Sequence, residues 1–314
     1  INRHLLNTNF NKGNFFFYKK FIFNRTLKKL NEFIFLKKIK NLLNPIIHST
    51  YYDLRYLRQV KCAKIVTIHD LIHEKFYKNK KIDYEDNKIN CINDADFFIC
   101  VSKSTQNDLI EHYNIDKKKT KVIYHSCTLP DVDYGFIKKK DFILFVGNRS
   151  GYKNSYFALK AFSKYKRIRD KIDFYFFGGL KFSKNEITNF RDLGIINNVK
   201  YLGNDERKLK SLYKKATCLI YPSNYEGFGI PLLEAMENNC PIICTDTPAL
   251  KEIGADAVQY FEKNNEESFI DSLDKVLYSD ELSNKLKILG KKRRNFFSWE
   301  KCARETEEVY SYFY

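Results

Sequence analysis

The sequence predicts an α/β protein made of two doubly wound, Rossmann-like domains. Its 314 residues, 44% of them hydrophobic, suffice for two separate cores. Short apolar runs alternate with polar, helix-like stretches, and this alternation implies parallel sheets with right-handed crossovers. The series restarts after the lysine run at residues 138–140. We therefore expect two domains, joined near residues 128–141.

In the first half of the chain, four apolar runs are typical of buried parallel strands. They cover residues 46–49, 64–69, 96–101 and 121–124. After the third run, Ser102 or Ser104 can cap a helix that ends near Tyr113.

The second half continues the same alternation. Its expected strands cover residues 142–147, 173–177, 199–202, 216–221, 241–244 and 257–261. Its expected helices cover residues 154–169, 184–193, 205–215 and 231–238.

The positive charge is unevenly distributed along the chain. The net charge is +17, and residues 1–140 hold 27 Lys or Arg against 14 Asp or Glu, a net of +13. The remainder holds 28 against 24, a net of +4. This asymmetry suggests an anionic partner for the first half only. Nucleic acid, an anionic membrane and a phosphorylated lipid all fit, as does a general drift towards lysine in composition.

Cysteine usage and hydropathy indicate a reduced cytoplasmic protein. No apolar run approaches the roughly 20 residues of a membrane span, and no cleavable signal pattern is present. The eight cysteines lack Cys-x-x-Cys spacing, and most lie in or beside apolar runs, as small core residues do. Cys240 and Cys244 have no nearby histidine to complete a metal site. We expect no metal cofactor.

Residues 221–234 are the most informative stretch. An apolar strand leads into a loop with Gly227 and Gly229, and Pro231 suits the first turn of the helix that follows. A helix start offers unpaired N–H groups to an anion. Glu226 and Glu234 flank the loop and can hold hydroxyl groups on either side of a phosphate. This pattern fits a nucleotide sugar, and the alternative is a helix cap with a solvated Glu234.

With these residues in place, the chain resembles the retaining glycosyltransferases of the GT-B fold, family 4 (group 1), over roughly residues 45–305. Glu226 and Glu234 match the Glu-x7-Glu motif of that family, with its Gly-Phe-Gly filling. Residues 145–149, followed by Lys153 and Asn154, match its donor-phosphate motif. Residues 67–71, 101–104 and 245–252 match further motifs more loosely.

The resemblance implies roles for individual residues. Glu226 and His69 would lie at the reacting sugar, although His69 could equally form a structural pair with Asp70. Glu234 would accept the ribose hydroxyls. Arg149 and Lys153 would neutralise the donor diphosphate. The expected backbone contacts to the donor come from Gly147, Gly227, Phe228, Gly229, Tyr201 and Leu202. His48, His73 and His125 are expected to be structural.

The resemblance also divides the chain into three parts. Residues 1–137 would form the acceptor-side domain, residues 138–294 the donor domain, and residues 295–314 a helix that crosses back to the first domain. The N-terminal glycine-rich loop of the family has no counterpart, since Gly13 is the only glycine among the first 134 residues. We therefore expect the first domain to be incomplete at its start. His125-Ser126 replaces the usual Asn-Gly.

The predicted function is retaining, metal-independent transfer of a sugar from a nucleotide-diphosphate sugar to a glycan acceptor. The acceptor would be a lipid-linked or cell-surface polysaccharide. The protein itself would contact the inner face of an anionic membrane peripherally and would bind no nucleic acid. Three alternatives stay open. They are a manganese enzyme using Asp94-Ala95-Asp96 or Asp131-Val132-Asp133, a glycosyltransferase-like binding protein with impaired catalysis, and a basic nucleic-acid-binding protein.

Overall fold

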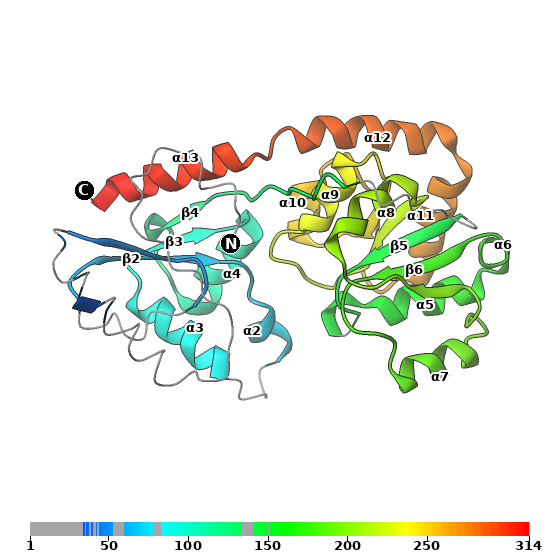
Figure 1. Cartoon of the computed structure of the whole chain (residues 1–314), viewed down its shortest axis with the longest axis horizontal. Coiled ribbons are helices and arrows are strands. Elements are labelled where there is room, and N and C mark those ends of the chain that lie inside the picture. Colours follow the sequence, from blue (N-terminus) through cyan, green and yellow to red (C-terminus); the bar gives the residue numbers. More distant parts are fainter. Residues whose placement is uncertain are drawn as a thin grey trace. The chain divides into compact units, whose positions relative to one another are not determined.

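The structure is a computed structural model of the whole chain (Figure 1). It describes residues 44–52, 60–77, 83–132, 141–149 and 151–313, together with 34, 36, 37, 39 and 42. The chain forms two compact units. The first unit comprises residues 1–67, 81–99 and 303–314, and the second comprises residues 68–80 and 100–302. The domain boundaries expected from the sequence stay predictions.

The second unit contains a six-stranded parallel sheet in the order β10-β9-β8-β5-β6-β7. From β5 the chain builds outward through β6 and β7, then returns to pair β8 with the other edge of β5. The strand order therefore reverses between β5 and β8, and such a switch point is where open α/β sheets bind ligands. The strands are β5 Phe142–Val146, β6 Asp173–Phe177, β7 Val199–Tyr201, β8 Cys218–Tyr221, β9 Ile242–Thr245 and β10 Gln259–Phe261.

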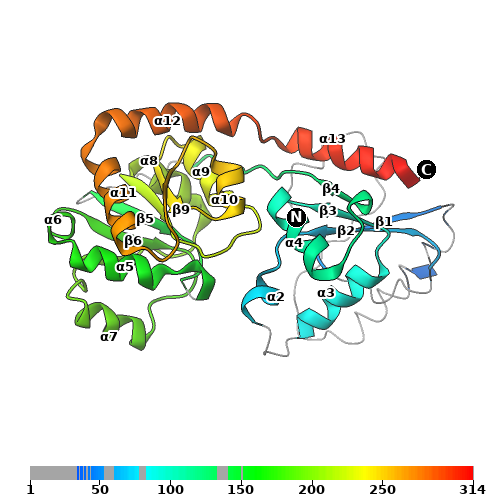
Figure 2. The same ribbon diagram turned by 180° about the vertical axis from the view of Figure 1, so that it is seen from behind.

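Successive side chains of a strand point to opposite faces of the sheet, and here both faces are apolar. Helices therefore cover both faces and form two apolar cores with the sheet. One core joins the sheet to α8 (Leu209–Lys215), α9 (Ile230–Glu237) and α10 (Pro248–Gly254). The other joins it to α5 (Ser155–Lys164), α6 (Lys166–Arg169), α7 (Lys184–Asp192) and α11 (Glu266–Tyr278). The sheet of the second unit lies between α5 and α9 in both views (Figure 1 and Figure 2).

A four-stranded sheet has the order β1-β2-β3-β4, formed by Ile46–Ser49, Ala63–Ile68, Phe97–Cys100 and Thr120–Val122. The first unit contains α3 (Asp83–Asp94) and the end of α13 (Trp299–Tyr310). His48 on β1 lies 2.7 Å from both Tyr310 Oη and Thr67 Oγ1. Phe97 packs edge-on against Tyr312 at 5.8 Å. These contacts fasten the last residues of the chain to the first unit.

The predicted architecture of two parallel α/β sheets is confirmed, and each expected run overlaps one of the strands β1–β10. Ser102 caps α4 (Lys103–Tyr113), as expected, by accepting a hydrogen bond from the Thr105 N–H. The helix predicted over residues 154–169 is interrupted instead, because Tyr165 leaves the helical conformation between α5 and α6. Helices α2 (Ile72–Phe76), α3, α10, α11 and α12 (Asp280–Arg294) were not predicted from the sequence.

All eight cysteines are free thiols, and four of them are fully buried. These four are Cys91, Cys100, Cys218 and Cys244. Burial raises the pKa of the Cys100 thiol to about 12, so that this side chain stays a neutral core group. Among the helices that the structure describes, none has the length and hydropathy needed to cross a membrane.

We expect Phe162→Ala to remove a large part of the core beneath α5. Phe162 is fully buried and packs edge-on against Phe174 at 5.5 Å. Truncation of such a side chain costs about 3–5 kcal/mol of the free energy of unfolding. Tyr156 lies on the same helix and is 50% exposed, so Tyr156→Ala is the matched control and should cost less than about 1 kcal/mol. Urea denaturation measures both, and equal losses would contradict this packing.

Candidate active site

Two loops meet at the switch point of the six-stranded sheet. One follows β5 and contains residues 147–153, and the other follows β8 and contains residues 222–229. Gly147 has φ +124°, a conformation that favours glycine, and its N–H donates to Phe177 O on the neighbouring strand at 2.9 Å. Because β5 pairs with β8, the predicted phosphate motif and the glutamate loop emerge from adjacent strands.

A buried ion pair links the two loops. Lys153 Nζ lies 2.7 Å from Glu226 Oε1 and 2.8 Å from Tyr221 Oη. The Lys153 and Glu226 side chains are only 13% and 8% exposed. Burial and the neighbouring Glu226 carboxylate hold the pKa of Tyr221 well above its usual value, which keeps its hydroxyl protonated. The structure thus pairs the cation predicted for the diphosphate with the carboxylate predicted for the transferred sugar.

The backbone beside Glu226 approaches another segment very closely. A Cβ built on Gly227 would lie 1.8 Å from His69 O and 2.9 Å from Asp70 Cβ. Only glycine fits such an approach. Gly227 therefore leaves room for the His69 carbonyl.

Helix α9 begins directly after this loop and has no side-chain cap. Gly229 precedes it with φ +108°, and Pro231 lies in its first turn, as predicted. Phe228 is 5% exposed and belongs to the core, so only its backbone can serve a ligand. In the described part of the chain, the amides of Phe228, Gly229 and Ile230 meet no acceptor. This helix start therefore retains the donors of an anion site.

Glu234, the second predicted carboxylate, lies on α9 in an environment that contains no cation partner among the described residues. Tyr213 Oη donates to Glu234 Oε2 at 2.9 Å. Burial raises the pKa of Glu234 to about 7; the Tyr213 hydrogen bond opposes that rise, and Glu206 adds to it. This carboxyl group titrates close to neutral pH.

Arg149 does not share the partners of Lys153. Its Nε lies 2.6 Å from Glu186 Oε1, and its Nη2 lies 2.6 Å from Leu180 O. The guanidinium stacks over Phe182 with a centroid distance of 4.9 Å, and its side chain is 8% exposed. Burial opposes ionisation of Glu186, but hydrogen bonds from Arg149 and Ser183 lower the pKa of its carboxyl group. In this arrangement Arg149 fixes the loop after β6.

The predicted nucleobase loop follows β7. Tyr201 Oη donates to Gly179 O at 2.9 Å, and Leu202 N–H donates to Phe176 O at 2.8 Å. Gly203 O in turn accepts from Gly178 N–H at 2.8 Å. These bonds connect the loops after β6 and β7, and the assignment of Tyr201 and Leu202 to a nucleobase stays a prediction.

His69 lies beside a second histidine. Its ring stacks on His125 with a centroid distance of 5.5 Å. Burial, assisted by the neighbouring His69, lowers the pKa of His125 to about 4, so that His125 is neutral at physiological pH. His125 also contacts Phe228 edge-on at 5.7 Å. This packing agrees with the structural role expected for His125.

Three residues of the site were missed by the sequence analysis: Tyr213, Glu186 and Thr105. Tyr213 binds Glu234 across 21 positions, and Glu186 binds Arg149 across 37. Thr105 binds Gly227 across 122 positions. No local pattern signals such contacts, because they depend on which strand ends lie side by side.

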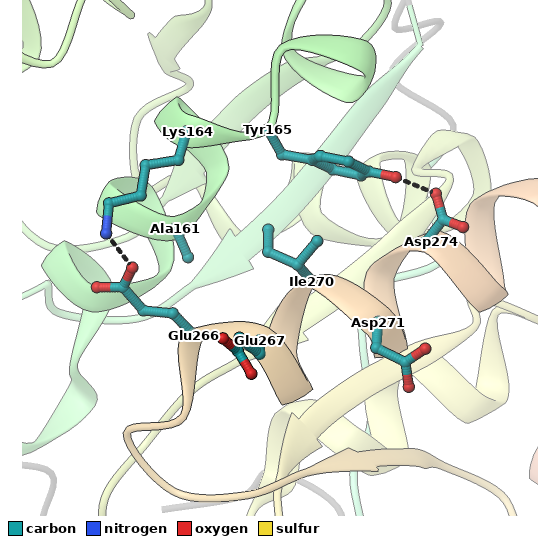
Figure 3. A pocket seen from close by; sticks show the side chains of 8 residues that line it. All are labelled: Ala161, Lys164, Tyr165, Glu266, Glu267, Ile270, Asp271 and Asp274. Carbon is teal, nitrogen blue, oxygen red and sulfur yellow. Dashed lines mark hydrogen bonds and ion pairs between the residues drawn. The ribbon is translucent and has the colours of Figure 1, made fainter.

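Among the described residues, the predicted site coincides with neither a metal-ligand cluster nor the cavity beside α5. No cluster of three or more His, Cys, Asp or Glu side chains suited to a metal occurs among the described residues. Of the two Asp-x-Asp matches, Asp96 accepts from Lys64 N–H and Asp131 pairs with Lys210, whereas Asp133 lies outside the described residues. A cavity of about 580 Å³ lies between α5 and α11, where Lys164 pairs with Glu266 and Tyr165 with Asp274 (Figure 3). None of the predicted site residues lines it.

Two regions of the chain match profiles of glycosyltransferase families. Residues 131–293 match the profile of the glycosyl transferases group 1, and residues 12–127 match that of glycosyltransferase family 4. The chain is 28% identical over 233 residues to the O-antigen chain mannosyltransferase RfbU of Salmonella typhimurium, covering 71% of this chain and 62% of that protein.

A second relative is the N-acetylgalactosamine-N,N'-diacetylbacillosaminyl-diphospho-undecaprenol 4-alpha-N-acetylgalactosaminyltransferase of Campylobacter jejuni. It is 27% identical over 218 residues, covering 67% of this chain and 59% of that protein. The chain thus spans about six tenths of the length of these relatives. The crystal structure of Anabaena HepE in complex with UDP and glucose matches with a TM-score of 0.72 at 14% identity, covering 93% and 84% of the two chains. This likeness confirms the predicted GT-B fold.

The raised pKa of Glu234 predicts a pH-dependent gain of stability in Glu234→Gln. The native carboxyl keeps its proton up to about pH 7, whereas an unfolded glutamate ionises near 4.5. The wild-type protein therefore loses stability as pH rises from 4.5 to 7, and the variant does not. We expect the variant to be more stable by on the order of 1–3 kcal/mol at pH 8 and equally stable at pH 4.5.

Denaturation at a series of pH values measures this difference. Glu307→Gln, a change at an exposed position of α13, is the control and should show no such trend. A difference between Glu234→Gln and wild type that does not change with pH would contradict the buried state of Glu234.

Proposed function

This chain belongs to the glycosyl transferases of group 1, and from that membership we propose that it transfers a sugar from a nucleotide-diphosphate sugar to a glycan acceptor. The observation that carries this proposal is the buried pair of Lys153 and Glu226, next to the uncapped start of α9 at the switch point of the sheet. This arrangement provides a cation and main-chain donors for a diphosphate, and a carboxylate for a sugar.

Lys153 is the cation that we assign to the diphosphate. An ammonium group has three donors, and Tyr221 and Glu226 accept two of them. The third remains for a phosphate oxygen. Negative charge grows on the diphosphate as the glycosyl bond breaks, and a fixed ammonium in a buried site stabilises that charge without a metal ion.

Glu226 is the carboxylate that we assign to the sugar. Lys153 occupies its Oε1 and keeps the group oriented. Its remaining oxygen can accept a sugar hydroxyl and favour positive charge that develops at the anomeric carbon. His69 faces the same loop through its backbone, and we propose that its side chain contacts the transferred sugar.

Glu234 would accept the two ribose hydroxyls of the nucleotide. A carboxylate offers acceptor sites on both oxygens, and Tyr213 uses part of one. Hydroxyl donors favour the ionised form, so donor binding would strengthen as pH rises through the pKa of about 7.

Arg149 can bind the diphosphate only if a phosphate oxygen takes the place of the Glu186 carboxylate at its guanidinium group. Its guanidinium is engaged by Glu186 and by carbonyl groups of residues 178–181. We therefore assign the main electrostatic role to Lys153, and to Arg149 a role in holding the loop after β6.

We propose a lipid-linked or cell-surface glycan as the acceptor and retention as the stereochemical course. The two relatives are an O-antigen chain mannosyltransferase and a transferase whose name includes diphospho-undecaprenol. The net charge of +13 over residues 1–140 suits an anionic lipid or its membrane. Family membership favours sugar transfer over nucleic-acid binding. NMR of the product tests retention, because the anomeric configuration of the donor must persist.

A thermal-shift screen against UDP-, GDP-, ADP- and TDP-sugars tests the donor site. At least one should raise the unfolding temperature, because a ligand that binds only the native state stabilises it. For the best binder, Glu234→Ala should weaken affinity by about 1–3 kcal/mol in calorimetry, since two hydrogen bonds to the ribose are lost. Glu307→Ala is the control. Unchanged affinity would remove Glu234 from the site.

Replacing Lys153 tests the leaving-group role. Lys153→Met keeps the length of the side chain and removes its charge, so turnover should fall by at least about 100-fold, or about 2.7 kcal/mol. Lys275→Met is the control, because Lys275 is 55% exposed in an ion pair with Asp271 and lies outside every matched motif. Circular dichroism verifies that each variant is folded. An unaltered rate in the folded Lys153 variant would refute its assignment.

A further inference from the structure

Two buried hydroxyl groups of α4 bind the glutamate loop. Ser102 Oγ donates to Gly227 O at 2.6 Å, and Thr105 Oγ1 donates to the same oxygen at 3.0 Å. Ser102 and Thr105 are both fully buried, and all three residues belong to the second unit. A carbonyl oxygen has two lone pairs, so this acceptor is saturated by two side chains of one helical turn.

This arrangement does more than cap the helix. The cap requires only that Ser102 Oγ accept the Thr105 N–H, at 2.9 Å. It uses neither the Ser102 proton nor the Thr105 hydroxyl. Ser102 Oγ lies 2.6 Å from Gly227 O and 3.1 Å from Thr105 Oγ1, and Thr105 donates to Gly227 O, so the shorter Ser102 contact and the Thr105 proton both serve the loop.

Fixing the Gly227 carbonyl also fixes the amide that follows it. In a trans peptide the C=O of one residue and the N–H of the next point in opposite directions. With Gly227 O turned to α4, the Phe228 N–H points away from α4. That amide is one of the unpaired donors at the start of α9. A glycine peptide without these hydroxyls could rotate and withdraw it.

The same helix holds the residue on the other side of Glu226. Tyr225 Oη donates to Asp108 Oδ2 on α4 at 2.7 Å and accepts from Leu71 N–H at 3.2 Å. Both neighbours of Glu226 are therefore fastened to α4. The first turn of α4 is itself held by Glu252, whose carboxylate accepts from Lys103 N–H at 2.7 Å and Ser104 N–H at 3.0 Å.

We propose that Ser102 and Thr105 are positioning residues for sugar transfer. They hold the Gly227–Phe228 peptide so that its N–H faces the donor and Glu226 keeps its place beside Lys153. This inference rests on the proposed function of the same loop. It assigns these hydroxyls to the geometry of the reaction, and not to contact with the acceptor.

Thr105→Val tests the inference, since it keeps the shape of the side chain and removes only the hydroxyl. With the sugar nucleotide that binds best in the screen, we expect kcat to fall at least tenfold while KM for the acceptor stays within twofold. Thr105→Ser restores the hydroxyl and should recover most of kcat. Ser102→Ala should also lower kcat, and it carries the test if the valine variant does not fold.

Ser279→Ala is the matched control, because Ser279 caps α12 through Leu282 N–H at 3.1 Å and lies far along the chain from the loop. It should lower the unfolding temperature as Ser102→Ala does and leave kcat unchanged. A kcat of Thr105→Val within twofold of wild type overturns the inference, as does an equal loss of kcat in Ser279→Ala. A rise confined to the acceptor KM would instead indicate acceptor contact and overturn it too.

The two proposals fail differently. A wild-type protein that neither binds nor turns over any of the sugar nucleotides refutes the proposed function, and the positioning role falls with it. An active wild-type protein with an unaffected Thr105→Val variant refutes the positioning role alone.

Discussion

The buried ion pair between Lys153 and Glu226 is the interaction on which the rest of the site depends. It joins the loop after β5 to the loop after β8, across the point where the strand order reverses. Two charges withdrawn from water are tolerated because each compensates the other and Tyr221 supplies a further hydrogen bond. Loss of either partner would leave an uncompensated buried charge, so the pair fixes the loops as well as the chemistry.

The loop that carries Glu226 is held by polar contacts on both sides. Gly227 lies against the His69 carbonyl, and the hydroxyls of α4 occupy its oxygen. Tyr225 is fastened to Asp108. A short loop with two glycines would otherwise have wide conformational freedom, and these contacts restrict it before any ligand arrives. Such preorganisation lowers the cost of aligning donors with the charge that develops during reaction.

The two glutamates of the motif are equivalent in the sequence and differ in their surroundings. Glu226 faces an ammonium group, whereas Glu234 faces a tyrosine hydroxyl in a buried setting that raises its pKa to about 7. The first group is suited to a site of charge development. The second is suited to hydroxyl donors whose binding responds to pH. One motif thus provides two different chemical functions, and the neighbours of each glutamate determine which.

The sequence by itself determined the approximate strands and the position of the glutamate loop, and it limited the cap of α4 to Ser102 or Ser104, because apolar runs, caps and glycine-bearing turns are local patterns. It also placed Lys153 and Glu226 in one site, through motifs that each follow a strand. Only the tertiary structure decided that Arg149 binds Glu186, that Tyr213 binds Glu234 and that Thr105 binds Gly227. Those contacts join residues far apart in the chain, and they exist only where the packing of helices on the sheets brings particular side chains within hydrogen-bond distance.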